Sequence, residues 1–218
     1  MVGAFRRLVR LAACWVVAPV IRVVLRAVPD GDRWERLPID APPVYHGVRR
    51  EHDFADYLRG PSGVPVGSVE DVESWLRGCT YKSDPDRSND WSLLPSEFEA
   101  RRSGTCLDHA LWAWRKLLDL GYWAEFVVGR DGAWAPDASR HAWVVFEREG
   151  RRYLLDATVK SDESMMVQLA DDAHDNYWPE FGVGASGERF VYGGYWRTLR
   201  AQFDAWWERG PKSGPPAV

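Results

Sequence analysis

The chain has 218 residues, of which 28 are basic and 32 acidic, so its formal net charge is −4. A composition of 45% hydrophobic and 28% charged residues is typical of a globular protein and excludes a largely disordered chain. There is no excess of positive charge for binding nucleic acid, and three cysteines do not fit a disulfide-stabilised secreted scaffold.

The positive charge is concentrated at the N-terminus. Residues 1–29 contain five arginines and no acid, a charge of +5, which leaves −9 for the rest of a chain whose total is −4. The uncharged run from Leu11 to Ile21 has about half of the roughly 20 residues that a transmembrane helix needs. We therefore expect residues 1–28 to form a basic apolar helix that either contacts a membrane surface or packs on its own domain. Arginines after the apolar run argue against a signal peptide, which favours a cytoplasmic or membrane-associated protein over a secreted one.

Residues 29–67 begin with a polar, proline-bearing stretch and are predicted to be a linker and wrapping segment, followed by a globular domain at residues 68–218. Ser68 and Asp71 form an S-x-x-D cap, which predicts a short helix that stops at Gly78. Residues 80–89 are predicted to be a loop. Another short helix is expected over residues 96–102.

The most regular segment is a predicted buried helix from about Thr105 to Leu120, in which apolar residues recur every three or four positions. Strands are predicted at residues 122–129, 141–147 and 152–157, followed by a strand near 190–192 and an aromatic helix around 199–207. The second and third strands are joined by a tight turn at Glu149-Gly150. A helix followed by antiparallel strands predicts an α+β fold.

Cys106 is the cysteine whose setting suits a nucleophile. It lies at the start of the predicted helix, where unpaired backbone N–H groups and the positive end of the helix dipole favour a thiolate. Gly104, just before it, allows close approach of a substrate to the backbone. Because a single buried cysteine is more often a small hydrophobic residue, this interpretation requires a base nearby. Cys14 and Cys79 are predicted to be packing residues.

The base must come from the five histidines, His46, His52, His109, His141 and His174. His141 begins a strand, from which its side chain can project into a cleft. With Glu149-Gly150 as a two-residue turn, Asp156 lies opposite Trp143, so His141 and Asp156 are diagonal neighbours about 7–8 Å apart at Cα. Taken singly, His141 is more often a surface residue and Asp156 a turn cap, but together with Cys106 they predict a catalytic triad.

Residues 91–158, about a third of the chain, resemble the transglutaminase-like superfamily, thiol enzymes of papain-type fold. The matching motifs are Gly104-Thr105-Cys106, the helical run to Gly121, the strand Phe126-Val127-Val128-Gly129, His141-Ala142-Trp143-Val144 and Leu155-Asp156-Ala157-Thr158. The resemblance implies a central helix that carries the cysteine and packs on an antiparallel sheet. It also implies Cys106 as nucleophile, His141 as general base and acid, and Asp156 as the carboxylate that orients the histidine, with no cofactor.

Two branches of the superfamily are similar in their motifs. The segment from Trp91 to Asp108 is similar to bacterial transglutaminase-like cysteine proteinases, whereas Cys106-Leu107 and the histidine motif are similar to peptidases that remove leader segments from lasso peptides. The first branch usually has acidic residues on both sides of the cysteine. Here Thr105 and Leu107 stand there and only Asp108 is retained, so the calcium site that this branch implies is left open.

Several further residues are assigned weaker functions. The Trp91 indole is a candidate second oxyanion donor, and His109 is expected to shape the site beside Cys106. Trp91, Trp143 and Trp178 are candidate walls of a peptide groove. The spacing Cys106-x-x-His109 resembles half of a zinc site, but one pair does not make a tetrahedral site, so no metal is predicted. Residues 182–187 match G-x-G-x-x-G without a preceding strand or a following apolar helix, and they are predicted to be a loop.

These observations predict a thiol-dependent amide hydrolase or acyl transferase, in the manner of a transglutaminase-like cysteine proteinase, that acts on a peptide or protein through an acyl-enzyme. The alternative is a catalytically silent module of the same fold that binds peptides or serves as a scaffold. The substrate, the oligomeric state and the choice between hydrolysis and amine transfer do not follow from the sequence.

Overall fold

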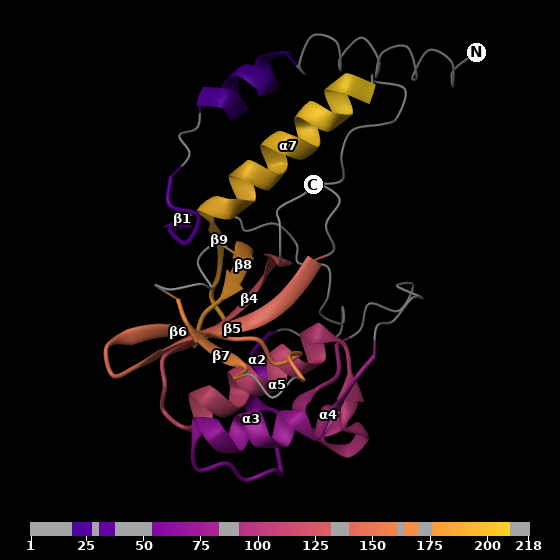
Figure 1. Cartoon of the computed structure of the whole chain (residues 1–218), viewed down its shortest axis with the longest axis vertical. Coiled ribbons are helices and arrows are strands. Elements are labelled where there is room, and N and C mark those ends of the chain that lie inside the picture. The colour runs from indigo at the N-terminus through magenta and orange to yellow at the C-terminus, as the bar shows by residue number, and fades with distance from the viewer. Residues whose placement is uncertain are drawn as a thin grey trace, which may run out of the picture.

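A computed structural model of the chain describes residues 19–27, 31–37, 54–82, 92–131, 140–160, 164–169 and 176–209. After a helical segment at residues 19–27, the elements are β1 (Arg36–Leu37), α2 (Phe54–Arg59), α3 (Val69–Arg77), β2 (Thr80–Tyr81), α4 (Pro95–Arg101), β3 (Ser103–Gly104), α5 (Cys106–Asp119), β4 (Ala124–Asp131), β5 (Arg140–Arg148), β6 (Arg151–Leu155), β7 (Met166–Gln168), β8 (Tyr177–Val183), β9 (Arg189–Tyr192) and α7 (Gly193–Arg209). The main sheet lies between helices α2 to α5 on one side and α7 on the other (Figure 1).

The main sheet has seven strands in the order β1-β9-β8-β4-β5-β6-β7, and every neighbouring pair is antiparallel. The short strands β2 and β3 form a separate parallel pair. Helix α5 packs against β4 and β5 at the centre of the main sheet. The predicted α+β fold, with the cysteine-bearing helix on an antiparallel sheet, is therefore confirmed.

The elements with strong local signals are confirmed within one or two residues, except that α7 begins six residues before the predicted helix. The helices α3, α4, α5 and α7 and the strands β4, β5, β6 and β9 all coincide with predicted elements. Sequence reasoning missed helix α2 and strands β1, β3, β7 and β8. Strand β2 lies inside a predicted loop.

The prediction that the whole G-x-G-x-x-G stretch at residues 182–187 is a loop is wrong in part. Gly182 and Val183 are not loop residues but the last residues of β8, and a turn at residues 184–187 connects β8 to β9. A Cβ at Gly182 would overlap the Phe190 ring, so the glycine is explained by close packing within a hairpin.

Alternation along β5 divides the core between the two faces of the sheet. Ala142, Val144 and Phe146 belong to the larger apolar cluster with α5, whereas Trp143 and Val145 belong to a second cluster on the opposite face. This is the period of two expected of a strand that is buried on both sides.

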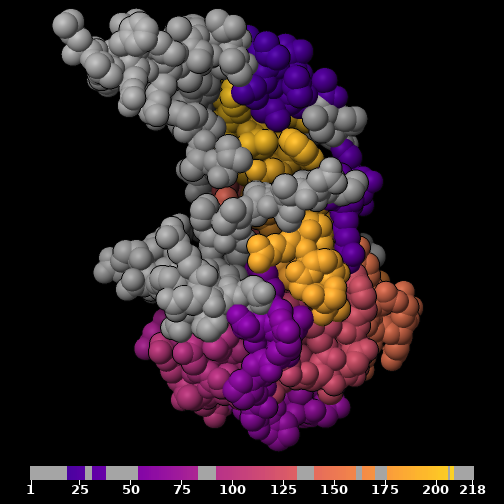
Figure 2. Space-filling model, turned by 180° about the vertical axis from the view of Figure 1, so that it is seen from behind, coloured from indigo at the N-terminus to yellow at the C-terminus, as the bar shows by residue number. Residues whose placement is uncertain are grey.

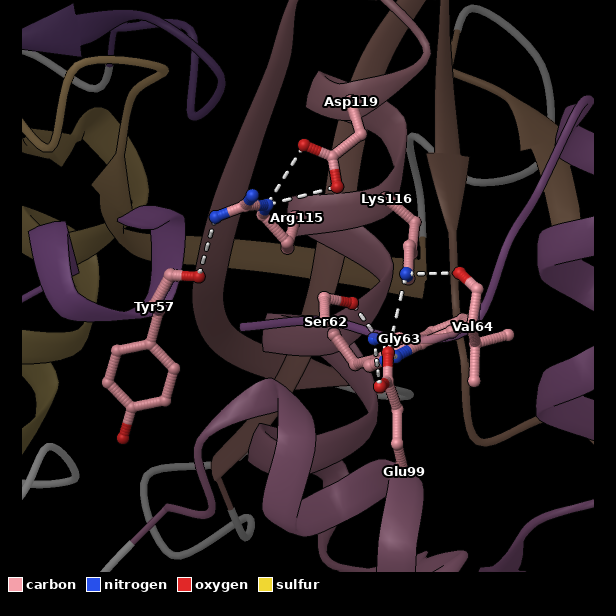
Figure 3. A network of polar contacts seen from close by, with 9 residues as sticks. Tyr57, Ser62, Gly63, Val64, Glu99, Arg115, Lys116 and Asp119 are labelled. Atoms are coloured by element: carbon pink, nitrogen blue, oxygen red, sulfur yellow. Dashed lines mark hydrogen bonds and ion pairs between the residues drawn. The ribbon is translucent and has the colours of Figure 1, made fainter. Parts of the chain in front are cut away.

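The wrapping segment contributes to the main core and is held to it by a polar network (Figure 3). Phe54 and Tyr57 of α2 are buried in the larger cluster. The Lys116 ammonium of α5 lies 3.3 Å from the Glu99 carboxylate of α4 and donates to the Val64 carbonyl. Glu99 also accepts hydrogen bonds from Ser62, Gly63 and the Trp112 indole, at 2.5, 2.7 and 2.9 Å. The network ties the segment before α3 to both helices beneath the sheet.

The helical segment at residues 19–27 packs on α7. Leu25 is buried against Phe203, and Arg22 forms an ion pair of 2.9 Å with Asp204. Within the described ranges, no helix is long and apolar enough to cross a membrane. Of the two expectations for the N-terminal helix, contact with its own domain is therefore observed for this part of it.

Candidate active site

Cys106 is the first residue of α5, and Asp108 fixes the backbone around it. Asp108 Oδ2 accepts hydrogen bonds from the Thr105 backbone N–H and hydroxyl at 2.7 and 3.0 Å, while Oδ1 accepts one from the Leu93 N–H at 2.6 Å. A Cβ on Gly104 would lie 2.6 Å from Asp108 Oδ2, so the glycine makes room for this carboxylate. The backbone that carries the half-buried Cys106 side chain is thus fixed by a cap that joins the start of α5 to the segment before α4.

The register predicted for the β5–β6 hairpin is confirmed. Glu149 and Gly150 both have positive φ, at 55° and 72°, as a tight two-residue hairpin turn requires. Arg148 pairs with Arg151 and Val144 with Leu155, so the next position brings Asp156 level with Trp143. His141 Nε2 and Asp156 Oδ2 lie 2.8 Å apart, which places the two sequence-predicted residues in direct contact.

Asp156 is held as a carboxylate by four hydrogen-bond donors. Oδ1 accepts from the Thr158 N–H and hydroxyl at 2.9 and 2.7 Å, and Oδ2 accepts from the Tyr177 hydroxyl at 2.8 Å in addition to the His141 imidazole. Burial favours the neutral acid, but His141 and Thr158 outweigh it and lower the pKa of Asp156 to about 2. The carboxylate is therefore charged at any physiological pH.

His141 lies between Asp156 and the Cys106 thiol. Burial disfavours its charged form, yet the hydrogen bond to Asp156 and the hydrogen bond to Cys106 raise the pKa of His141 to about 10. Since Nε2 is occupied by Asp156, the other ring nitrogen, Nδ1, is the one that can meet the thiol. The structure thus brings Cys106, His141 and Asp156 together as a chain of contacts from α5 to β5 and the end of β6.

His109 and Trp143, predicted to shape the site, are both fully buried. His109 Nδ1 donates to the Thr105 carbonyl at 2.8 Å, and burial lowers the pKa of His109 to about 4, so its imidazole is neutral. The Trp143 ring lies 6.1 Å from the His141 ring and 5.0 Å from the Tyr177 ring, centroid to centroid. Trp143 is therefore a packing support for His141 rather than an exposed groove wall. Trp91, the candidate oxyanion donor, is outside the described residues.

Two tyrosines near the site were not found from the sequence. Tyr177 starts β8, a strand without a clear local signal, and its ring reaches across Trp143 to Asp156. Tyr81 is 44% exposed, and burial of the remainder together with the charges of Cys106 and Asp156 raises its pKa, which places it beside the site. The sequence signal for both is weak because each comes from a loop-like stretch far from the triad.

The described residues do not form a metal site. No group of three or more side chains from histidine, cysteine, aspartate and glutamate comes together in the described part of the chain. Both oxygens of Asp108 already accept hydrogen bonds from the protein, so the single acidic residue retained beside Cys106 does not fit a calcium site. In the Cys106-x-x-His109 spacing that resembles half of a zinc site, His109 Nδ1 is already bound to the Thr105 carbonyl.

Comparison with known proteins finds similarity at the level of solved structures. No protein-family model and no curated protein matches the chain. The structure of calcium-bound LapG from Legionella pneumophila aligns with 18% identity and a TM-score of 0.46, covering 63% of this chain and 75% of that one. A second LapG structure from the same organism aligns with 19% identity and a TM-score of 0.44, covering 72% and 84%. A TGase aligns with 17% identity and a TM-score of 0.34, covering 50% and 30%. Likeness at these levels concerns the fold, and the function proposed below rests on the side chains of this chain.

Proposed function

We propose that this protein is a thiol-dependent amide hydrolase or acyl transferase of the transglutaminase-like kind, acting on a peptide or protein. The observation that carries the proposal is the contact chain from Cys106 through His141 to Asp156, in which His141 Nε2 lies 2.8 Å from a carboxylate held by three further donors. A structural role would not require a buried histidine to bind a thiol and a carboxylate at once.

The first half of the reaction forms a thioester. With the Cys106 proton on His141 Nδ1, the thiolate attacks the amide carbonyl, and the C–N bond then breaks as His141 gives that proton to the leaving amine. The Cys106 backbone N–H, which has no acceptor within its own helix, is suited to bind the oxyanion. Asp156 stabilises the imidazolium and fixes its ring throughout this step.

The second half regenerates the enzyme. His141 takes a proton from water, or from an acceptor amine, as that nucleophile attacks the thioester, and the C–S bond breaks to release an acid or a new amide. We favour water, since the proposed catalytic domain at residues 68–218 needs no cofactor for hydrolysis.

The segment at residues 29–67 is proposed to wrap this domain, and residues 1–28 to attach to it.

The test is selective alkylation of the proposed nucleophile. Purified wild-type protein is treated with an iodoacetamide probe at neutral pH, and the labelled cysteine is located by mass spectrometry. Rapid labelling of Cys106 is expected in wild type. The rate should be unchanged in Cys79→Ala, a control that removes a buried cysteine, and strongly slowed in His141→Ala. If wild type labels no faster than Cys106→Ala, the nucleophile assignment is wrong.

A second measurement separates the active enzyme from the silent module. Wild type and Cys106→Ala are incubated with a library of unstructured peptides, with and without a primary amine such as cadaverine. New termini or deamidated side chains indicate hydrolysis, and amine incorporation indicates transfer. Rapid alkylation of Cys106 with neither product favours the peptide-binding module.

A further inference from the structure

The helical segment at residues 19–27 exposes apolar side chains that its packing on α7 leaves uncovered. Val20, Val23 and Val24 are 61%, 69% and 57% exposed. Residues three and four apart lie on one side of a helix, so these valines and the exposed Ala27 form one stripe, which we call the valine face.

The valine face points away from the protein. Leu25 and Arg22 lie on the opposite side of the same helix, where Leu25 contacts Phe203 and Arg22 contacts both Asp204 and the Trp207 ring. Burial of this helix against its own domain therefore accounts for Leu25 and Arg22 but not for the valines.

Such a concentration of exposed apolar residues is local. The described residues contain seven large hydrophobic side chains classed as exposed, and four of these lie between Val20 and Val24. Single exposed valines are common on protein surfaces, but a contiguous stripe marks an interaction surface. Both the helix and α7 lie at the end of the molecule opposite to α3 and α4 (Figures 1 and 2).

The charge beside this face indicates which partner. Residues 1–29 carry five arginines and no acidic residue, in a chain whose total charge is negative. Arg26 is on the same short helix with 58% of its side chain exposed, 3.7 Å from the Asp204 carboxylate. An apolar stripe bordered by exposed arginine is the pattern of a helix that lies in the interface of an anionic membrane. A second copy of the chain docked on the same face would bring the two sets of N-terminal arginines together.

We propose that the valine face docks this protein on an anionic lipid surface, with α7 as the rigid support that holds the helix at residues 19–27 parallel to that surface. Valine side chains enter the boundary between headgroups and acyl chains, while the exposed Arg26 at the border of the face contacts lipid phosphates. The active site is thereby held near substrates that are themselves at the membrane. Docking does not depend on Cys106 chemistry, so it can be tested separately from the proposed function.

The experiment is co-sedimentation of the full chain with vesicles of phosphatidylcholine alone or with 30% phosphatidylglycerol. Wild type is expected to bind the anionic vesicles, with binding that weakens as salt increases. The variant Val20→Ser/Val23→Ser/Val24→Ser is expected to reduce the partition coefficient at least about tenfold, because three apolar side chains no longer enter the lipid. The matched control is Val167→Ser, a substitution at an exposed valine of β7 that should leave binding unchanged.

Every other result overturns the proposal. Binding that survives the triple substitution but is lost on deletion of residues 1–18 would assign it to that segment instead. A wild-type protein that does not bind the anionic vesicles would refute the proposal. A dimer that the triple variant cannot form would assign the valine face to a protein contact. Retained circular dichroism and unchanged Cys106 alkylation verify that the variants are folded.

Discussion

The substitution Asp156→Asn tests whether the carboxylate maintains a charged histidine beside the thiol. The carboxamide has nearly the same shape and keeps an oxygen that can accept from Thr158, as Asp156 Oδ1 does at 2.7 and 2.9 Å. It removes the negative charge that lies 2.8 Å from His141 Nε2. Any change in reactivity therefore reports the charge rather than a cavity.

The size of the effect follows from the pKa of His141. A pKa of about 10 keeps the ring almost fully protonated at pH 7.5, whereas the ordinary value of 6.5 leaves about a tenth of it protonated. Asp156 is one of the two groups that raise this pKa, and burial alone would lower it. In Asp156→Asn only Cys106 opposes the effect of burial, and a return of the His141 pKa to its ordinary value lowers the imidazolium population at pH 7.5 about tenfold.

The assay is the rate of Cys106 alkylation by iodoacetamide between pH 5 and pH 9.5. In wild type His141 stays protonated below its folded pKa of about 10, so the imidazolium lies beside the thiol over most of this range. In Asp156→Asn the rate at pH 7.5 should be about tenfold lower, because fewer His141 rings carry the positive charge that stabilises a thiolate.

The control is Asp119→Asn, the same chemical change at the far end of α5, where the exposed carboxylate pairs with Arg115 at 2.9 Å. This variant should behave as wild type. A profile of Asp156→Asn that superimposes on wild type would refute the reasoning, because the histidine would then be charged without its carboxylate.

Three further outcomes are expected from urea unfolding at pH 7. Tyr177→Phe should lower the free energy of unfolding by about 1–3 kcal/mol, because a buried carboxylate loses a donor at 2.8 Å, and the loss should shrink in the Asp156→Asn background. Gly129→Ala should cost about 1–3 kcal/mol or more, since its Cβ would overlap the Trp178 carbonyl oxygen; a neutral result would contradict the close approach of β4 and β8. Lys116→Met should cost about 1–3 kcal/mol by leaving the half-buried Glu99 carboxylate without its cation, and a loss below about 0.5 kcal/mol would show that the ion pair contributes little.

Local signals were sufficient where the determining interactions are close in the chain. The period of apolar residues predicts the helix that begins at Cys106, because this pattern repeats within one or two turns. The turn at Glu149-Gly150 determines which residues of β5 and β6 face each other, so the pairing of His141 with Asp156 could be calculated before any fold was known.

Contacts between distant segments could not be read in this way. The strand β8 contains a proline and lacks a clear alternation of apolar and polar residues. Nothing near Tyr177 in the sequence indicates that β8 pairs with β4, which brings the Tyr177 hydroxyl to Asp156. The same holds for the network that joins Glu99, Lys116 and the segment before α3, whose members come from three separate elements.

The sequence by itself determined the position of the cysteine at a helix start, the histidine and aspartate on one hairpin, and the basic, apolar N-terminus. Only the tertiary structure decided that the hairpin faces the cysteine, that Tyr177 supports the carboxylate, and that the helix at residues 19–27 packs through Leu25 and leaves its valines outside. The physical reason is that helix period, caps and turn register depend on neighbours in the chain. The order of strands and the docking of helices depend instead on which apolar surfaces, far apart in sequence, are buried together.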